Sequence, residues 1–225
     1  MKPNVVCALA AAAAFTLPAT ARAKSHEQLW ATGSATVKVS DRWRILQEVA
    51  VRTSDSRNGI YEVESNTLLG YRVNDHVTVA AGYTHDPQYA EGKFKTMEHR
   101  AREQVTFDNL ARLGPVKLAA RIRLEQRWRE GVDGTGWRLR PYAKASLPLA
   151  GKVALNFSSE PFFNLSHTAF QKSTGLDRVR NLVSLSAPLS KALSGEIGYM
   201  NQHGFVRGGP DTSDNIAYLA LSLNL

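Results

Sequence analysis

The sequence has little cysteine and no long hydrophobic run. Its 225 residues include a single cysteine, Cys7, which excludes a disulfide-stapled fold and a zinc site built on several cysteines. No run of about 18 consecutive apolar residues occurs, so a conventional transmembrane helix is excluded as well. Hydrophobic residues nevertheless make up 43% of the chain, which is too many for an intrinsically disordered protein.

The beginning of the chain predicts a cleaved secretory signal peptide. Lys2 supplies a short positive segment, an apolar stretch of small residues follows, and two small-x-small sites come next. We favour cleavage after Ala23, which divides the chain into a signal peptide, residues 1–23, and one exported domain, residues 24–225. Because the first part contains two basic residues and no acidic one, cleavage lowers the formal net charge from +8 to +6. It also removes Cys7.

The exported domain alternates between apolar and polar residues, which is the pattern of β-strands with two different faces. In the clearest segment, residues 116–128, one face carries Val116, Leu118, Ala120, Ile122 and Leu124, and the other carries Lys117, Arg121, Arg123, Glu125 and Arg127. Eleven such segments predict strands over residues 29–40, 42–53, 60–73, 77–85, 96–107, 116–128, 136–147, 152–165, 176–188, 194–203 and 214–225. Because bacterial single-chain barrels have an even number of strands, we expect ten or twelve.

The connections between these segments alternate between short turns and longer loops. The longer loops are expected over residues 54–59, 86–95, 129–136, 166–175 and 204–213. Such an alternation is typical of outer-membrane barrels, and a strand of about 12 residues tilted by roughly 40° spans their apolar band of about 25 Å. The predicted fold class is therefore all-β: a closed antiparallel transmembrane β-barrel of about 10–12 strands.

The composition of the two faces predicts which of them points inward. One face carries mainly Leu, Val, Ala and Ile, whereas the other carries clusters of Arg and Glu. Apolar residues of a membrane barrel contact lipid and polar residues line its lumen, so we expect the ions inside. The predicted lumen charge network consists of Glu98, Arg100, Arg102, Arg121, Arg123, Glu125, Arg127, Arg138, Arg140, Glu160, Arg178, Arg180 and Glu196.

Several short strings, taken in order, resemble a known family. They are Glu98-His99-Arg100, Arg123-Leu124-Glu125-Gln126-Arg127-Trp128, Glu160-Pro161-Phe162-Phe163-Asn164, Arg178-x-Arg180 and Glu196-Ile197-Gly198-Tyr199. In this order and spacing the chain resembles the bacterial family catalogued as domain of unknown function 2490 (DUF2490), from about Trp30 to Leu225. The resemblance implies an outer-membrane β-barrel and brings no catalytic residues with it.

The ionic lumen has three interpretations. Isolated ions in a narrow lumen cost several kcal/mol each, so they must be paired or hydrated. Paired Arg and Glu would form an interlocked plug, whereas hydrated ones would line a narrow pore that favours anions. A site for a phosphate- or carboxylate-bearing ligand is the third interpretation. Under the first, Arg123→Leu leaves Glu partners unpaired and costs roughly 3–5 kcal/mol.

Enzymatic and metal-dependent functions are less well supported by the residues. An outer-membrane lipid-modifying hydrolase could draw on Ser158 or Ser166 with His167 and Asn164, but no nucleophile-elbow motif is present. Adjacent side chains on an extended chain point oppositely, which separates Ser166 from His167. The six histidines show no metal-ligand spacing, and we expect no catalytic residue, cofactor or metal.

The sequence therefore predicts a monomeric, non-enzymatic protein of the bacterial outer membrane, structural or forming a narrow pore. Its expected partners are outer-membrane lipid and small anionic solutes. Nucleic acid is not expected, although the pI is about 9.7, because the arginines are spread over alternate strand positions. A soluble periplasmic ligand-binding barrel remains as an alternative, and it requires the reverse facing, with an apolar cavity.

Overall fold

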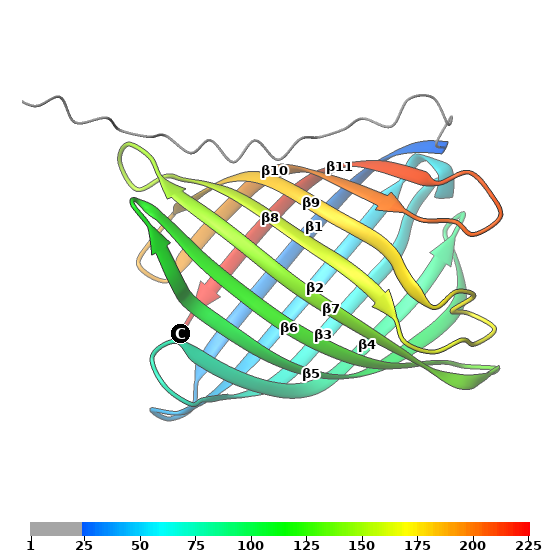
Figure 1. Ribbon diagram of the computed structural model, residues 1–225, viewed down its shortest axis with the longest axis horizontal. Helices are drawn as coiled ribbons and strands as arrows, with labels where there is room; N and C mark the ends of the chain where they lie inside the picture. Colours follow the sequence, from blue (N-terminus) through cyan, green and yellow to red (C-terminus); the bar gives the residue numbers. More distant parts are fainter. Residues whose placement is uncertain (1–23) are drawn as a thin grey trace, which may run out of the picture.

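The computed structural model describes residues 24–225, which form one closed β-barrel (Figure 1). The strands are β1 (Lys24–Lys38), β2 (Trp43–Ser54), β3 (Gly59–Arg72), β4 (Val77–Ala90), β5 (Lys93–Leu113), β6 (Val116–Arg129), β7 (Val132–Pro148), β8 (Ala154–Asn164), β9 (Gly175–Pro188), β10 (Leu193–Gly204) and β11 (Thr212–Asn224). One short 3-10 helix, η1 (Asp55–Arg57), follows β2. The predicted signal peptide, residues 1–23, lies outside the described residues.

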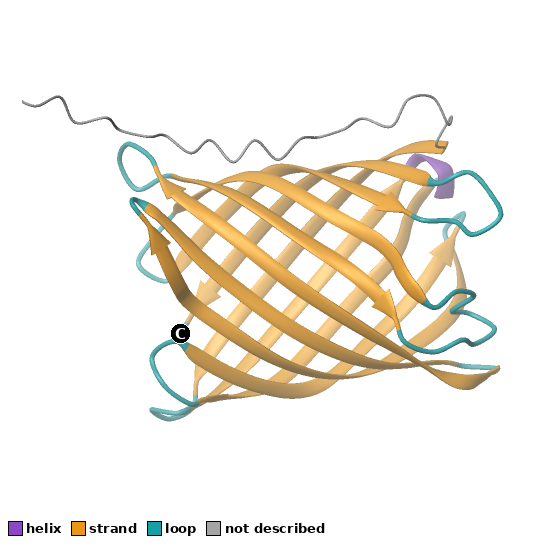
Figure 2. Cartoon of the chain, in the orientation of Figure 1, coloured by secondary structure: helices purple, strands orange, loops and turns teal. Residues whose placement is uncertain are grey.

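Strands make up almost the whole wall, and the loops are confined to the two ends of the barrel (Figure 2). Each strand pairs with its neighbours in sequence, and β1 closes the barrel against β11. The closed all-β barrel predicted from the alternation is thus confirmed. None of the helices among residues 24–225 has the length and apolar character needed to cross a membrane.

The closing pair of strands corrects the expectation of an even strand number. All eleven predicted segments form strands, and the barrel contains eleven. Ten neighbouring pairs are antiparallel, but β1 and β11 are parallel, with Lys24 opposite Thr212 and Thr36 opposite Asn224. The reason is geometric: strands that alternate in direction give the first and eleventh the same direction, so an odd number closes only through a parallel pair.

The two ends of the barrel differ in their connections. One end carries the connections β2–β3, β4–β5, β6–β7, β8–β9 and β10–β11, together with the start of β1. We call it the loop end, and it lies on the right in Figure 1. The other end, called the C-terminal end, carries the remaining turns and Leu225, whose backbone N–H donates to the carbonyl of Thr36 at 2.9 Å.

Two of the predicted long loops are strand instead. β4 continues to Ala90 and β5 starts at Lys93, so the connection expected over residues 86–95 is a tight turn. Both turn residues, Glu91 and Gly92, have positive φ angles of 53° and 70°. Two-residue turns with positive φ angles match the right-handed twist of paired strands, so β4 and β5 stay paired up to the turn. The expected loop over residues 129–136 is shortened in the same way.

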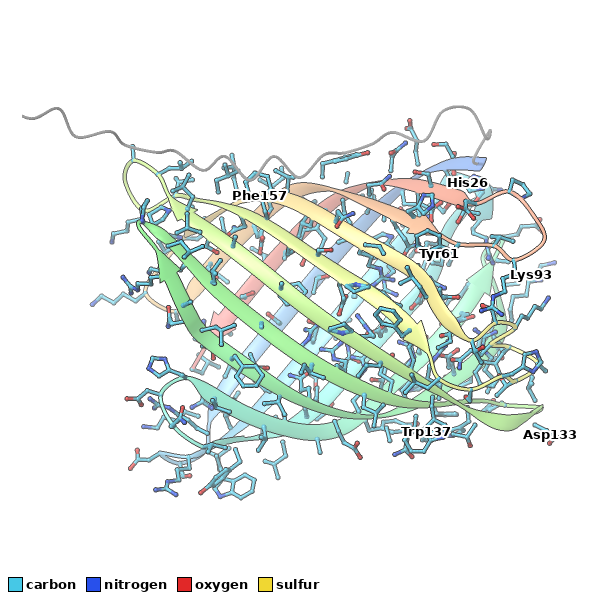
Figure 3. The ribbon with its side chains drawn as sticks, viewed as in Figure 1. His26, Tyr61, Lys93, Asp133, Trp137 and Phe157 are labelled. Atoms are coloured by element: carbon cyan, nitrogen blue, oxygen red, sulfur yellow. The ribbon has the colours of Figure 1, made fainter. Side chains whose placement is uncertain are left out.

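The faces of the strands are oriented as the composition predicts. Ile122 is 51% exposed on the outer surface, whereas its neighbours Arg123 and Glu125 are buried. Phe157 on β8 and Trp137 on β7 likewise lie on the outside of the wall (Figure 3). Most of the buried side chains are polar or charged, which is the reverse of a soluble barrel. The interior therefore holds the ions, and the outer surface carries most of the apolar residues.

One part of the interior is apolar. Trp30, Met200 and Ile216 form a small buried cluster beside the parallel seam, with Leu182 and Tyr218 packed against it. The ionic side chains come mainly from β2 to β8, on the other side of the barrel. The interior is thus divided between an ionic sector and a smaller sector next to the seam.

Candidate functional site

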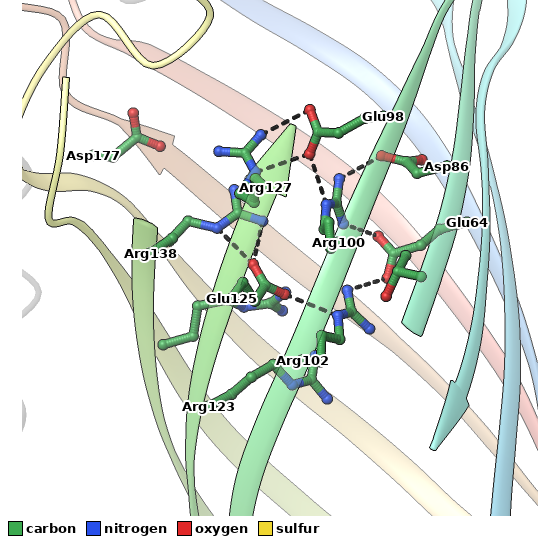
Figure 4. A network of polar contacts seen from close by, with 12 residues as sticks. Glu64, Asp86, Glu98, Arg100, Arg102, Arg123, Glu125, Arg127, Arg138 and Asp177 are labelled. Carbon is green, nitrogen blue, oxygen red and sulfur yellow. Dashed lines mark hydrogen bonds and ion pairs between the residues drawn. The ribbon is translucent and has the colours of Figure 1, made fainter. Parts of the chain in front are cut away.

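A continuous set of ion pairs fills the ionic sector of the barrel, and Figure 4 shows its centre. We call this set the ion-pair network. It joins eight arginines and six acidic residues from β2 to β8, which gives a formal excess of two positive charges: Arg52, Arg100, Arg102, Arg121, Arg127, Arg129, Arg138 and Arg140 with Glu62, Glu64, Asp86, Glu98, Glu125 and Glu160.

Glu125 is one of three carboxylates in the network that each pair with three arginines. Its side chain is fully buried, and it pairs with Arg102 at 3.1 Å, Arg138 at 2.5 Å and Arg140 at 2.7 Å. The three arginines come from β5 and β7, the two strands that flank β6. Register explains the arrangement, because Arg102 and Arg138 both lie directly opposite Glu125 in the sheet.

Glu98 and Glu64 connect the remaining arginines. Glu98 is fully buried and accepts contacts from Arg100 at 2.7 Å, Arg127 at 2.8 Å and Arg129 at 2.7 Å. Glu64 on β3 pairs with Arg100 and Arg102 at 2.9 and 2.7 Å. Each carboxylate thus serves several guanidinium groups. Such sharing offsets the desolvation of buried ions, which amounts to several kcal/mol per ion.

The network contains nine of the thirteen residues predicted for it. Four lie elsewhere: Arg178 pairs with its neighbour Asp177, and Glu196 lies 3.6 Å from Lys144. Arg123 and Arg180 have no carboxylate within 4 Å in the part of the chain that the structure describes. The reason given for the expected cost of Arg123→Leu is therefore wrong, because the substitution would leave no Glu of the described residues without a partner.

Five members of the network lie outside the predicted set of thirteen: Arg52, Glu62, Glu64, Asp86 and Arg129. The alternation does place Arg52, Glu62 and Glu64 on inward polar faces, so for these three only the pairing was not predicted. Asp86 and Arg129 were expected in loops, and both lie in strands that continue past the predicted ends. A signal existed for Asp86, since Thr84 and Asp86 continue the alternation of β4 and are both fully buried. Pairing across the lumen could not be read from the alternation.

A stack of alternating cations and aromatic rings crosses the lumen near the loop end. The guanidinium carbon of Arg52 lies 4.4 Å from the ring centre of Trp30, and that of Arg180 lies 4.5 Å from it. Arg180 also lies 4.6 Å from the ring of Phe162, which Arg140 approaches to 4.3 Å. Each contact contributes about 0.5–2 kcal/mol. The stack links residues of β2, β1, β9, β8 and β7 across the interior.

Three cavities follow one another through the barrel. A mouth cavity of about 380 Å³ opens at the loop end, and a central cavity of about 180 Å³ lies beyond the stack. Trp30 and Arg180 line both of them. A third cavity, of about 350 Å³, lies at the C-terminal end between Lys144, Lys152 and Ser222. It has no lining residue in common with the central cavity.

Loops at the loop end fold onto the interior. Gln171, 2% exposed, accepts a hydrogen bond from Arg127 at 3.2 Å and donates to the carbonyl of Trp137 at 3.0 Å. The loop between β10 and β11 is tied by Asp211, whose carboxylate accepts the backbone N–H of Val206 and the ring N–H of His203. These donors lower the pKa of Asp211, so this tie is lost only as the pH falls through that lowered pKa.

A group of three acidic residues has a spacing suited to a metal ion. Carboxylate oxygens of Glu62, Glu64 and Asp86 lie within 4.8 Å of one another. Arg52 pairs with both Glu62 and Glu64, and Arg100 pairs with Glu64 and Asp86. The guanidinium groups already supply the positive charge that a cation would bring, so the donor set fits ion pairs better than a metal.

The residues considered for hydrolysis are not assembled into a catalytic group. Ser158 lines the central cavity inside the barrel, whereas His167 is exposed in the loop after β8. Ser166 donates to the carbonyl of Thr135 at 3.4 Å, and Asn164 donates to Asp177 at 3.2 Å. Within residues 24–225 no hydrogen bond joins His167 to either serine.

Comparison with known proteins assigns the chain to a family. Residues 27–213 match the family model described as Protein of unknown function (DUF2490), and the chain belongs to this family. The resemblance read from the sequence is thereby confirmed. An uncharacterized protein of Methylorubrum extorquens is 28% identical over 201 residues, which cover 88% of this chain and 86% of that protein. No solved structure matches the chain.

Proposed function

We propose that this protein is an integral β-barrel of the bacterial outer membrane that catalyses no reaction and whose interior admits only small solutes. Its partners under this proposal are outer-membrane lipid and small anions, and it acts as a monomer. The observation that carries the proposal is the combination of an apolar outer surface with an ionic interior in a closed barrel. In a bilayer a closed barrel satisfies the backbone hydrogen-bonding groups between its strands, and this orientation of the two faces keeps the charged side chains away from lipid.

The outer surface has the size and composition that a bilayer requires. Leucine, isoleucine and valine side chains are exposed on many strands, among them Leu69 at 51%, Ile197 at 61% and Leu221 at 52%. A monomeric soluble protein seldom exposes a continuous apolar surface of more than a few hundred Å². Strands of 11 to 21 residues are also longer than the five or six residues usual in soluble sheets.

The filled interior favours a plug over an open pore. The ion-pair network occupies the ionic sector, the stack crosses the lumen, and the central cavity measures only about 180 Å³. A cavity of this volume holds roughly six water molecules at ~30 Å³ each. Passage of solutes would therefore be restricted to small ions, and the excess of arginine would favour anions.

Fractionation and single-channel recording together test the proposal. We expect recovery in the outer-membrane fraction and faster migration on a detergent gel before heating than after it. In planar bilayers the purified protein should show no conductance, or steps far below those of a general diffusion porin. Recovery as a soluble periplasmic monomer would contradict the membrane location, and large steady conductance would contradict the plug.

The absence of catalysis is proposed from the separation of Ser158 and His167. We expect purified protein to release no acyl chains from phospholipid or lipopolysaccharide micelles above the rate without protein. His167→Ala should leave that background rate unchanged. Release that disappears in His167→Ala would instead support the lipid-modifying hydrolase.

A soluble ligand-binding barrel fits poorly with a polar interior and an apolar outer surface. Such a barrel needs an apolar cavity and a polar exterior. Here the cavities along the lumen are lined by residues such as Arg178, Arg121 and Lys144, and residues such as Ile122 lie outside.

A further inference from the structure

Two arginines beside the central cavity lack the carboxylate partner that the others have. The cavity lies among interior residues of nine strands and is lined by five arginines. Arg52, Arg121 and Arg140 are engaged by acidic residues of the ion-pair network. Arg123 and Arg180 are not, and within residues 24–225 no acidic group comes within 4 Å of either of them.

Arg123 projects from β6 into the barrel and is 6% exposed. Its Nε donates to the side-chain oxygen of Gln104 at 3.0 Å. Its two terminal nitrogens have no hydrogen-bond partner among the described residues. A buried guanidinium with free donors is a costly arrangement unless an anion or water completes it.

Arg180 reaches the same cavity from β9. Its Nε donates to Gln202 at 2.8 Å, and its guanidinium plane is flanked by Trp30 and Phe162. The aromatic rings hold the group in place but accept no hydrogen bond in its plane. Its terminal nitrogens are therefore also free of partners within the described barrel. The hydroxyl groups of Tyr142 and Ser158 line the cavity as further donors.

The acidic residues that line the cavity leave a positive excess. Glu64 and Glu160 are engaged by arginines of the ion-pair network. Glu48 accepts a hydrogen bond from Asn66 at 2.9 Å and has no basic partner within 4 Å in the described part of the chain. Glu48 lies four residues before Arg52 on β2, about 13 Å along the strand and toward the C-terminal end.

We infer that the central cavity is a binding site for one small oxyanion of the phosphate or sulfate type, held by Arg123 and Arg180. Planar guanidinium forks match the oxygens of such an anion in geometry and charge. The volume of about 180 Å³ admits a small anion with a few waters and excludes drug-sized ligands, which need roughly 300 Å³ or more. The inference uses only the barrel interior, so it stands or falls independently of the membrane location.

The mouth cavity adjoins this site on the side of the loop end. It shares Arg180 and Trp30 with the central cavity, and Arg57 and Arg178 also line it. Its acidic residues are engaged: Glu62 by Arg52, Asp177 by Arg178, and Asp214 by the amide of Gln202 at 2.9 Å. The lining of the mouth cavity thus holds three arginines, Arg57, Arg178 and Arg180, against three acidic residues, and an anion entering from the loop end would meet these arginines first.

Titration of the purified barrel in detergent with inorganic phosphate tests the inference, with chloride at equal ionic strength as reference. We expect calorimetry to give one site per chain and phosphate to raise the unfolding temperature saturably. Arg123→Gln and Arg180→Gln should each weaken phosphate binding by at least about tenfold. Arg112→Gln removes the same charge from an exposed position on β5 and should leave binding unchanged.

Two further measurements are expected to show a gain, one in unfolding temperature and one in phosphate affinity, which a variant that merely folds poorly would not show. In phosphate-free buffer Arg123→Gln should unfold at a higher temperature than the wild type, because an unpaired buried charge is removed. Glu48→Gln should tighten phosphate binding, because it removes a lining carboxylate. Absence of saturable binding to the wild type, or equal weakening in Arg112→Gln, would overturn the site.

Phosphate carried by a lipid is distinguished by phosphatidic acid dispersed in the same detergent. A cavity inside the barrel admits the free anion but not one tethered to acyl chains, so we expect no competition with inorganic phosphate. Competition at equal concentrations would place the binding on the outside or at the rim, and it would contradict the central cavity.

Discussion

Glu125→Gln is expected to destabilise the barrel by about 3–5 kcal/mol, because it removes the charge shared by three buried arginines. Glu125 is fully buried and pairs with Arg102, Arg138 and Arg140. The amide keeps the shape of the side chain, so the loss reflects uncompensated guanidinium charge and not a cavity. Denaturant unfolding of detergent-refolded protein measures the change as a lower midpoint at an unchanged slope.

Glu103→Gln is the matched control for this experiment. Glu103 lies on the outer face of the adjacent strand β5, opposite Leu124, and forms no ion pair within the described residues. The same chemical change should therefore leave stability unaltered or raise it, since a charge leaves the apolar surface. If Glu125→Gln costs less than about 1 kcal/mol, the ion pairs do not stabilise the interior in the way the geometry indicates.

Leu124→Arg is expected to cost roughly 2–4 kcal/mol in a bilayer, because it places a charge on the lipid-facing surface near the middle of β6. Leu124 lies on the outer face of β6 beside Ile122, in a groove of the outer surface that is lined mainly by apolar side chains. Refolding into lipid vesicles followed by denaturant unfolding gives the value. A soluble protein would instead fold in detergent-free aqueous buffer, and the same substitution would cost it less there, because no lipid surrounds the arginine.

Leu113→Arg tests the depth dependence of that result. Leu113 ends β5 at the C-terminal end of the barrel and is 66% exposed. An arginine near the membrane interface costs only about 0–1 kcal/mol. Equal costs at the two positions would contradict a bilayer that surrounds the middle of the barrel.

The strand set and its facing were accessible from the sequence because a strand alternates with a fixed period of two. Ile122 has an even number and Glu125 an odd one, so their side chains point to opposite faces of β6. Once the apolar face is assigned to the exterior, Ile122 lies outside and Glu125 inside. The prediction failed where alternation was interrupted by turn-like residues. Asp86 was assigned to a loop over residues 86–95 because this segment bears Asp and Gly, yet β4 and β5 remain paired to Ala90 and Lys93.

Partner choice inside the lumen was not accessible in this way. Glu98 pairs with Arg127, 29 positions away, and Arg100 reaches Glu64, 36 positions away. Both contacts depend on the register of neighbouring strands and on the curvature that brings the inner faces together. The same geometry leaves Arg123 without a carboxylate, although its sequence context differs little from that of Arg121 and Arg127.

The sequence by itself determined an eleven-segment all-β domain with ions on one face, because composition and period-two alternation are local properties of the chain. Tertiary structure alone decided the parallel closure of β1 against β11, the ion-pair network and the stack of Trp30 with Arg52 and Arg180. The physical reason is that closure, shear and register fix which distant side chains meet, and these quantities belong to the whole barrel.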